Sequence, residues 1–252
     1  MWITPERVFY AGLLGQPERH AKGGLAVYVA IEGPLRLRLD GGDWQSAEVA
    51  VVPPYVPAQV ACEGRHVIVL VIEPESLVLE SLPPLLRERG PVDSPAFAQR
   101  VRDVHARMVA SGGCPPETGN TASAEFDLLF FGEALPARRI DARIAAALDR
   151  LREDLAEPVT AEACAAAAGW SVSRFLHRFK DEVGASFRVV RAWKRARGLL
   201  HHVRRDENLV HVALDIGYPD STHFSHSIRQ TYGLKPRDIF AGSRKLRIID
   251  GL

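Results

Sequence analysis

This sequence of 252 residues is poor in cysteine, has almost no net charge and contains no run of eighteen apolar residues. Without such a run there is no candidate transmembrane helix, and we expect no membrane partner. The three cysteines, Cys62, Cys114 and Cys164, are an odd number without metal-binding spacing, which favours reduced thiols over a disulfide framework. Because the first residues also lack a basic-then-apolar signal pattern, we expect a cytoplasmic location.

The chain also lacks the side-chain groupings that catalysis needs. We find no Ser-His-Asp, Cys-His or paired-carboxylate constellation. His211, His223 and His226 are close in the sequence, but no carboxylate or thiolate completes a zinc site at helical spacing. We therefore expect no cofactor and no metal, and we do not expect an enzyme.

Charge is divided unequally along the chain. Residues 1–137 hold 11 Lys and Arg against 17 Asp and Glu, whereas residues 138–252 hold 21 against 14. The first part has a net charge of −6 and the second a net charge of +7. A basic part attached to an acidic part is typical of a nucleic-acid-binding domain joined to another domain. The alternative, a solvated basic surface without a partner, fits the charge alone equally well.

Short apolar and alternating segments, punctuated by Gly and Pro, predict β-structure in the first seventy or so residues. The segments expected to form strands are 25–31, 35–39, 48–52 and 66–72. Many short strands of this kind indicate a small barrel or sandwich. From 75 to 135 the pattern becomes helical, with 96–110 and 123–135 as the best helices and a break at 111–116. The apolar run 128–131 fits a dimer interface and packing within its own domain equally well.

The chain from residue 137 onwards predicts helices. Asp141 is a candidate N-cap for a helix with an apolar stripe, and Pro158 ends the segment. Thr160 is a candidate N-cap for the next, alanine-rich helix. A longer helix over 187–202 is expected to bury one side and to carry basic residues at its other positions. The apolar stripes are Ile144, Leu148, Leu151 and Leu155 in the first helix and Val190, Trp193, Ala196 and Leu200 in the long one; the basic positions are Arg188, Arg191, Lys194, Arg195 and Arg197.

One small motif occurs twice in the last third of the chain. In each copy a small residue precedes a glycine by four positions, an aromatic residue follows the glycine, and two bulky apolar residues at i, i+4 open the next helix. The first copy is Ala165, Gly169, Trp170, Phe175, Phe179 and Gly184; the second is Ala213, Gly217, Tyr218, Phe224, Ile228 and Gly233. This is the layout of a helix-turn-helix, whose second helix enters the major groove of DNA. Two copies indicate a transcription regulator.

With the apolar pair of each second helix turned inward, the helical step fixes the outward face. Ser173 and His177 point outward in the first copy, and Thr222 and His226 do so in the second. The flanking residues are Arg174 and Lys180, then His223 and Arg229. Hydroxyl and imidazole groups hydrogen-bond to base edges, whereas Arg and Lys bind phosphate or guanine. Ser171 and Asp220 stand where the N-caps are expected.

The two copies resemble the DNA-binding domain of the AraC-type transcription regulators. Segments 168–180, 217–226 and 233–237 carry the resemblance, which extends over about the last hundred residues. It implies two helix-turn-helix units joined by a long helix and bound to adjacent major grooves on one face of double-stranded DNA. Arg is common in the family where His177 and His226 stand, so the resemblance does not supply the target sequence.

Carried over position by position, the family's base-reading places are Ser173, Leu176 and His177, then Ser221, Thr222 and His226. Leu176 offers contact only to apolar groups such as the thymine methyl. The full set of residues expected to contact DNA is Ser173, Arg174, Leu176, His177, Arg178, Lys180, Ser221, Thr222, His223, Ser225, His226 and Arg229.

The N-terminal half more faintly resembles the cupin-type sensor domain of many such regulators, through its strand pattern and segment 52–57. Metal-binding cupins place histidines where this chain has His20 and Lys22, and another near Ala58. Two of these three positions lack an imidazole, so a small-molecule pocket or a plain dimerisation barrel is expected instead of a metal site. Strand alternation alone suggests Tyr28, Arg36, Arg38 and Trp44 as pocket linings.

The sequence thus predicts an α+β protein with three parts: a cupin-like β-barrel sensor over 1–75, a helical linker or dimerisation region over 76–136, and an all-α DNA-binding domain over 137–252. The expected partners are double-stranded DNA, RNA polymerase, a small-molecule effector and a second copy of the chain. One alternative is a cupin-like enzyme with a helical regulatory tail. Another is a regulator that works without any ligand.

Overall fold

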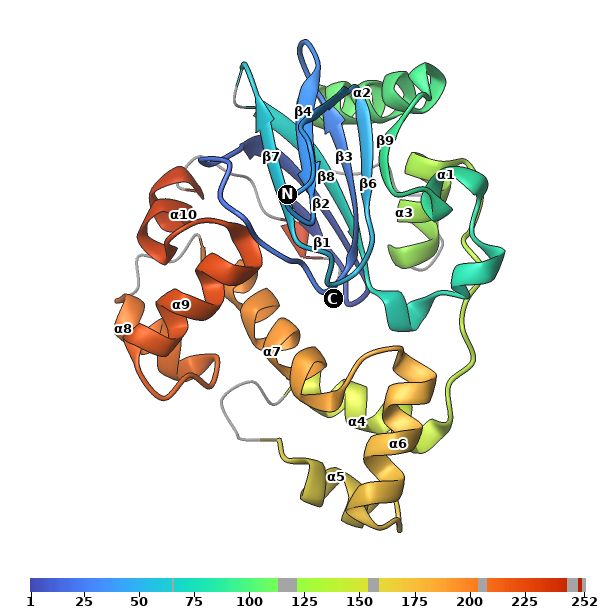
Figure 1. Ribbon diagram of the computed structural model, residues 1–252, viewed down its shortest axis with the longest axis vertical. Coiled ribbons are helices and arrows are strands. Elements are labelled where there is room, and N and C mark those ends of the chain that lie inside the picture. Colours follow the sequence, from blue (N-terminus) through green and yellow to red (C-terminus); the bar gives the residue numbers. More distant parts are fainter. Residues whose placement is uncertain (65, 113–121, 154–158, 204–207, 244–248, 251–252) are drawn as a thin grey trace. The chain divides into compact units, whose positions relative to one another are not determined.

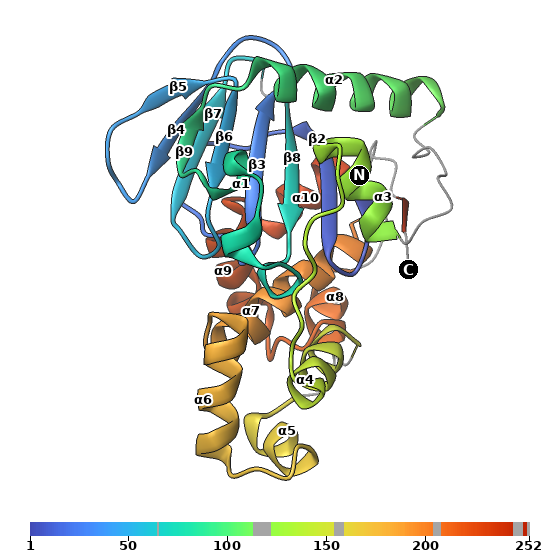
Figure 2. The ribbon, with the colours of Figure 1, turned by 90° about the vertical axis from the view of Figure 1, so that its right-hand side faces the viewer.

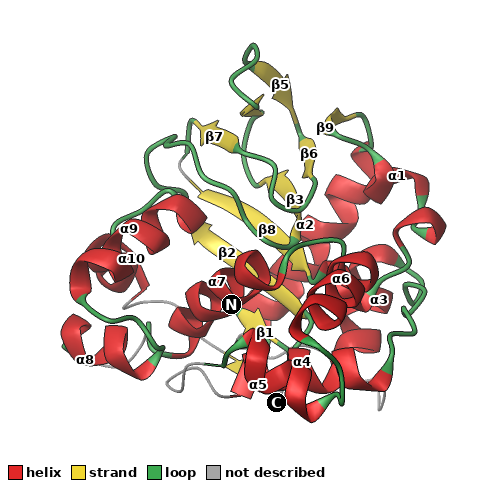
Figure 3. Cartoon of the chain, turned by 60° about the horizontal axis from the view of Figure 1, so that its bottom comes forward, coloured by secondary structure: helices red, strands yellow, loops and turns green. Residues whose placement is uncertain are grey.

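The computed structural model of the chain (Figure 1) describes residues 1–64, 66–112, 122–153, 159–203, 208–243 and 249–250. The chain divides into two compact units, Met1–Ala137 with Lys245–Leu252, and Arg138–Arg244. We call them the β unit and the helical unit. In Figure 3, where strands are yellow, all the labelled strands belong to the β unit.

The β unit contains two sheets. The strand order is β10-β1-β2-β8-β3-β6-β9 in the larger sheet and β5-β4-β7 in the smaller. The strands are β1 (Trp2–Ile3), β2 (Arg7–Leu13), β3 (Leu25–Ala30), β4 (Leu35–Leu39), β5 (Gln45–Ala47), β6 (Val49–Val52), β7 (Ala58–Cys62), β8 (His66–Ile72), β9 (Gly90–Val92) and β10 (Ile249–Asp250).

All four segments predicted as strands are present, as β3, β4, β6 and β8. The order of strands followed by helices confirms the mixed fold class. Within the described part of the chain, however, the strands form two open sheets and no closed barrel. Strand β9 interrupts the region expected to be helical, and it pairs antiparallel with β6 at Val49, Ala50 and Val51. This pairing joins segments about forty residues apart, which a local pattern does not reveal.

Helices α1 (Pro84–Arg87), α2 (Pro95–Ala110) and α3 (Ala122–Phe131), with the 3₁₀ turns η1 (Pro74–Ser76) and η2 (Leu79–Ser81), complete the β unit (Figure 2). Strands β3 and β8 are rich in Val, Ile and Leu, and every residue of β3 is buried. Residues of α2 and α3, such as Val101 and Phe126, belong to the same apolar core as Ile68 and Leu70. The helices and the sheet therefore share one core.

The apolar run 128–131 contributes to this core. Phe130 is fully buried and stacks on Phe9, with ring centroids 5.2 Å apart. Leu129 and Phe131 pack against the same cluster, whereas Leu128 is 40% exposed. Packing within its own unit accounts for most of the run. Helix α3 ends at Phe131, four residues short of the predicted end, where Gly132 takes a φ of +84°.

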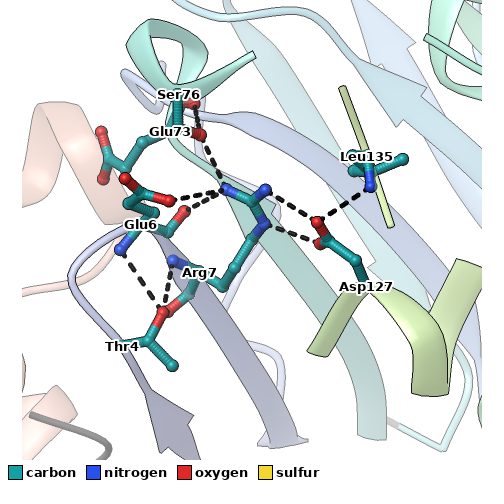
Figure 4. Close-up of polar contacts among 7 residues, drawn as sticks. All are labelled: Thr4, Glu6, Arg7, Glu73, Ser76, Asp127 and Leu135. Carbon is teal, nitrogen blue, oxygen red and sulfur yellow. Dashed lines mark hydrogen bonds and ion pairs between the residues drawn. The ribbon is translucent and has the colours of Figure 1, made fainter. Parts of the chain in front are cut away.

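A buried ion pair ties α3 to the sheet (Figure 4). Arg7 and Asp127 are each 3% exposed. The Arg7 guanidinium donates to both carboxylate oxygens of Asp127 at 2.8 and 3.0 Å and to the Ser76 hydroxyl at 2.7 Å. The backbone N–H of Leu135 donates to the same carboxylate at 3.2 Å. The ion pair and its hydrogen bonds thus connect β2, η1 and the end of the unit. Removal of one partner of such a buried pair costs about 3–5 kcal/mol of stability.

The helical unit is built from α4 (Ala142–Glu153), α5 (Ala161–Ala167), α6 (Val172–Val183), α7 (Phe187–Gly198) with the 3₁₀ turn η3 (Leu199–His201), α8 (Leu209–Asp215), α9 (Ser221–Tyr232) and α10 (Pro236–Ser243). Asp141 and Thr160 are N-caps as predicted, since Asp141 accepts from the backbone N–H of Arg143 and Thr160 from that of Ala163. Ile144, Leu148 and Leu151 are buried. Leu155 and Pro158 lie outside the described residues.

Helix α7 differs from the prediction in two ways. Lys194 and Arg197, expected on a basic side, are 3% and 7% exposed. Both α4 and α9 pack on α7, so neighbours cover more of this helix than of a helix on the surface. The aliphatic parts of the Lys194 and Arg197 side chains are buried by this packing. The last turn is 3₁₀, which changes the angular step and buries Leu199 more deeply than Leu200.

No helix within the described residues is both long enough and apolar enough to cross a membrane.

Candidate nucleic-acid interface

Both copies of the repeated motif end their first helix in the same way. Gly169 and Gly217 have φ of +67° and +79°. The next residues, Trp170 and Tyr218, donate their backbone N–H to the carbonyls of Ala165 and Ala213 at 3.0 and 2.8 Å. The glycine N–H groups bond to the carbonyls three residues back. These are two Schellman motifs, and a glycine is needed at the left-handed position of each.

The second helix of each copy begins with a side-chain cap and ends at a glycine. Ser171 accepts from the backbone N–H of Arg174 at 3.3 Å, and Asp220 accepts from those of Thr222 and His223, each at 2.8 Å. Helix α6 ends at Gly184 and α9 at Gly233, both left-handed. The predicted caps are confirmed. The repeat is therefore a structural duplication, α5–turn–α6 and α8–turn–α9.

Each second helix buries the predicted apolar pair. Phe175 and Phe179 are fully buried, and Phe224 and Ile228 are 1% and 0% exposed. Phe175 and Phe179 also pack edge-on against Phe187 of α7, with centroids 5.6 and 5.3 Å away. Tyr232, at the end of α9, donates its hydroxyl to the Ala196 carbonyl of α7 at 3.1 Å. Both second helices are thus fixed against the same connecting helix.

The residues expected to contact DNA lie on the opposite faces. On α6 all of them are exposed: Ser173, Arg174, Leu176, His177, Arg178 and Lys180. On α9 Ser225 is half-buried and the others are exposed: Ser221, Thr222, His223, His226 and Arg229. Leu176 is 39% exposed, so its side chain is accessible for contact with an apolar group such as a thymine methyl.

The exposed face of α6 is ordered by contacts that the sequence did not reveal. The guanidinium groups of Arg143 and Arg174 lie 4.0 and 5.3 Å from the centre of the Trp170 ring. A cation over an indole face is stabilised by the ring quadrupole, so Trp170 orients Arg174. Arg178 forms an ion pair with Glu182 at 2.7 Å. Trp170 belongs to the repeated motif, but no spacing signal connects it with Arg143, which precedes it by 27 positions.

On α9 one carboxylate both caps the helix and holds a histidine. The Nδ1 atom of His223 lies 2.7 Å from Oδ2 of Asp220. Because a carboxylate only accepts, Nδ1 carries the proton, and in the neutral ring Nε2 is then an outward acceptor. Hydrogen bonds from the His223 backbone and side chain hold the pKa of Asp220 below its usual value. On α6, His177 instead places Nε2 3.3 Å from Asp181 of the same helix.

Among the residues described, no group of three or more His, Cys, Asp or Glu side chains is placed to hold a metal ion. The four suggested pocket linings of the β unit lie in different surroundings. Tyr28 is buried beside His20 and Lys22. Arg36 instead stacks on the exposed Trp44, at 5.6 Å from its ring centre, and Arg38 donates to the carbonyls of residues 41 and 42.

The geometry defines a protein with two helix-turn-helix units joined by one helix. Residues 164–242 match a family model described as a helix-turn-helix domain. The chain is 34% identical over 158 residues to the HTH-type transcriptional activator RhaS of Klebsiella pneumoniae (57% of this chain, 54% of the relative). It is 36% identical over 110 residues to RhaS of Escherichia fergusonii (40% of this chain, 37% of the relative). The chain thus spans about half the length of the first relative, and less of the second.

Solved structures share the whole fold. An apo form of a ToxT variant from Vibrio cholerae superposes with a TM-score of 0.58 at 12% identity, covering 94% of this chain and 97% of that one. Wild-type ToxT from the same organism, bound to an unsaturated fatty acid, gives 0.53 at 11% identity over 94% and 95%. At this identity the likeness concerns the fold alone. The family match and the RhaS relatives confirm the resemblance of this chain to transcription regulators of the AraC type.

Proposed function

We propose that this chain is a sequence-specific DNA-binding transcription regulator. The observation that carries the proposal is the duplicated unit: two helices that are each capped by a side chain, that each bury a bulky apolar pair at i, i+4, and that each expose a hydroxyl, an imidazole and a basic group. Both pack on α7, so their outward faces are held in a fixed relation. Such units bind successive major grooves, whose centres are about 34 Å apart along one face of the duplex.

Within this proposal the exposed side chains divide into two roles. Arg174, Lys180 and Arg229 neutralise phosphates and give affinity. Hydroxyl, imidazole and apolar groups read base edges: Ser173, Leu176 and His177 on α6, and Ser221, Thr222, His223 and His226 on α9. Arg178 is held by Glu182 and Ser225 is half-buried, so both support the interface from its edge.

The β unit is proposed to receive the signal. We keep the assignment of 1–75 as a cupin-like sensor, 76–136 as a helical linker or dimerisation region, and 137–252 as the DNA-binding domain. Because the sheet shares one apolar core with α2 and α3, a ligand that displaces the strands would also shift these two helices. Since ToxT binds an unsaturated fatty acid, a small-molecule effector is proposed here too, together with RNA polymerase and a second copy of the chain as partners.

The experiment is selection of binding sites from random DNA by the full chain, followed by footprinting and binding at several salt concentrations. A preferred site protected over about two helical turns per protomer is expected, with affinity that falls steeply with salt. Arg174→Ala is expected to weaken binding, whereas Arg107→Ala, which removes an exposed Arg of the β unit, serves as the charge-matched control. Absence of any sequence preference at every salt concentration would contradict the proposal.

A further inference from the structure

A lysine, a histidine and a tyrosine meet inside the β unit, in a place that DNA binding does not use. The Nζ atom of Lys22 lies 2.7 Å from the Tyr28 hydroxyl and 2.8 Å from Nε2 of His20. Tyr28 and His20 are 1% and 7% exposed, and Lys22 is half-buried. Within the described residues no carboxylate lies within 4.0 Å of this amine.

The hydrogen-bond pattern suits a neutral amine. His20 has Nδ1 3.0 Å from the Glu18 carbonyl, so Nδ1 carries the proton and Nε2 is an acceptor. The two N–H groups of a neutral Lys22 amine then match two acceptors, His20 Nε2 and the Tyr28 oxygen. The Tyr28 hydroxyl lies 3.2 Å from the same Nε2 atom, which accepts its proton in a hydrogen bond, so the lone pair of the amine is left for a ligand. Nζ lies 5.2 Å from the Tyr28 ring centre but 2.7 Å from the hydroxyl. It is therefore near the edge of the ring, where the aromatic face does not stabilise a cation.

The backbone around the amine is held in place. His20 and Ala58 exchange backbone hydrogen bonds at 3.0 and 2.8 Å, and Tyr55 donates its N–H to the Lys22 carbonyl at 2.7 Å. Tyr55 has a φ of +62°, a left-handed conformation that is uncommon for a bulky residue and that clusters at ligand sites. Burial lowers the pKa of Lys22 to about 7 and that of His20 to about 3, and it raises the pKa of the Tyr28 phenol.

We propose that Lys22 is a covalent modification site that forms an imine with a small carbonyl compound, an aldehyde or a ketone. The amine lone pair attacks the carbonyl carbon, and the C=O bond opens onto oxygen. One proton passes from nitrogen to His20 Nε2, and the Tyr28 hydroxyl donates its proton to the new oxygen. His20 then returns its proton to this new hydroxyl, which leaves as water, and the remaining N–H proton passes to the Tyr28 oxygen, so that both side chains end neutral. Loss of water closes the C=N bond, so that amine and carbonyl give imine and water. No oxidant or metal enters the balance.

The test is reductive trapping on the full chain at pH 7.4 with propanal and cyanoborohydride, followed by peptide mapping. The exposed Lys180 and Lys235 are internal controls in the same molecule. An ordinary lysine with a pKa near 10.4 is almost wholly protonated at this pH, so Lys22 is expected to be alkylated at least about tenfold faster than either control. Its rate is expected to level off above about pH 7.

Two results would overturn the assignment. One is alkylation of Lys22 no faster than that of Lys180 and Lys235. The other is that Lys22 forms no propanal adduct although propionate binds at the site, which would make it a non-covalent anion site. Tyr28→Phe is the second variant: it keeps the ring and removes the hydroxyl, and it is expected to slow trapping at Lys22 while leaving the control lysines unchanged.

The use of the imine as a regulatory signal rests on the proposed function. The imine site and the regulatory function are tested by different measurements. DNA affinity of the trapped protein is compared with that of a Lys22→Met variant given the same propanal and cyanoborohydride, because both proteins then carry the same modification at Lys180. If Lys22 is trapped selectively but DNA affinity does not change, the imine site stands and its role as an effector site is wrong. If Lys22 is trapped selectively in a protein that prefers no DNA sequence, the imine site stands and the proposed regulatory function is wrong.

Discussion

The two second helices, α6 and α9, share one construction but present different chemistry. Helix α6 exposes three cationic side chains, Arg174, Arg178 and Lys180, the first ordered by stacking on Trp170. Helix α9 exposes one, Arg229, among hydroxyl and imidazole groups. In the turn before α9, Tyr218 takes the position that Trp170 has before α6, and its hydroxyl hydrogen-bonds to Ser227 at 2.7 Å. Under the proposed function, we therefore expect phosphate contacts to be concentrated on α6 and base contacts on α9, although each helix carries residues of both kinds.

The largest expected effect tests the shared construction. Phe175→Ala and Phe224→Ala each remove a side chain that is at most 1% exposed, so each is expected to lower the free energy of unfolding of the helical unit by about 3–5 kcal/mol. Denaturant unfolding followed by circular dichroism measures this. Leu176→Ala, at an exposed position of α6, is the control and is expected to change stability by less than about 0.5 kcal/mol. Equal effects of all three would mean that the buried pairs do not support the helices.

The division of tasks is tested by binding. Arg174→Ala is expected to weaken binding to all sequences and to reduce the slope of log K against log salt by about 0.9, because one phosphate contact is lost. His226→Ala is expected to leave the slope unchanged and to lose about 1–3 kcal/mol of discrimination at one base pair. Fluorescence anisotropy with the selected site and its single-base variants separates the two. The reverse pattern would exchange the roles of α6 and α9.

The two N-caps provide a smaller and sharper contrast. Ser171→Ala removes only a cap and is expected to cost about 0.5–2 kcal/mol of stability, without a change in base preference. Asp220→Ala removes a cap and also frees the His223 ring, so it is expected to change base preference too. Asp220→Ser restores the cap but not the ring contact. If Asp220→Ser kept wild-type base preference, the hold on His223 would have no part in readout.

The contrast also shows which features are predictable from sequence. Caps, turns and buried pairs were predictable because each involves residues within a few positions, as with Asp220 and its backbone donors. Strand β2 pairs with β8 from Arg7↔Ile72 to Leu13↔His66, a non-local pairing without a strong alternating pattern in residues 7–13. The meeting of Lys22, His20 and Tyr28 likewise depends on strand placement. The burial of Lys194 was missed because composition alone marks lysine as exposed.

The smallest expected effect concerns pH. The pKa of Asp220 is lowered from its ordinary 3.8, chiefly because the backbone N–H of His223 donates to the ionised carboxylate. A carboxyl with a lowered folded pKa stabilises the protein fully above the unfolded value and loses that contribution as pH falls through the folded one. Ser171 does not titrate, so the cap of α6 persists in acid while that of α9 weakens. Hydrogen exchange of the backbone N–H groups of Thr222 and His223 is expected to lose protection as pH falls below about 3.8, relative to that of Arg174. In Asp220→Ser the two helices should respond alike, and a persistent difference would show that some other acid group controls α9.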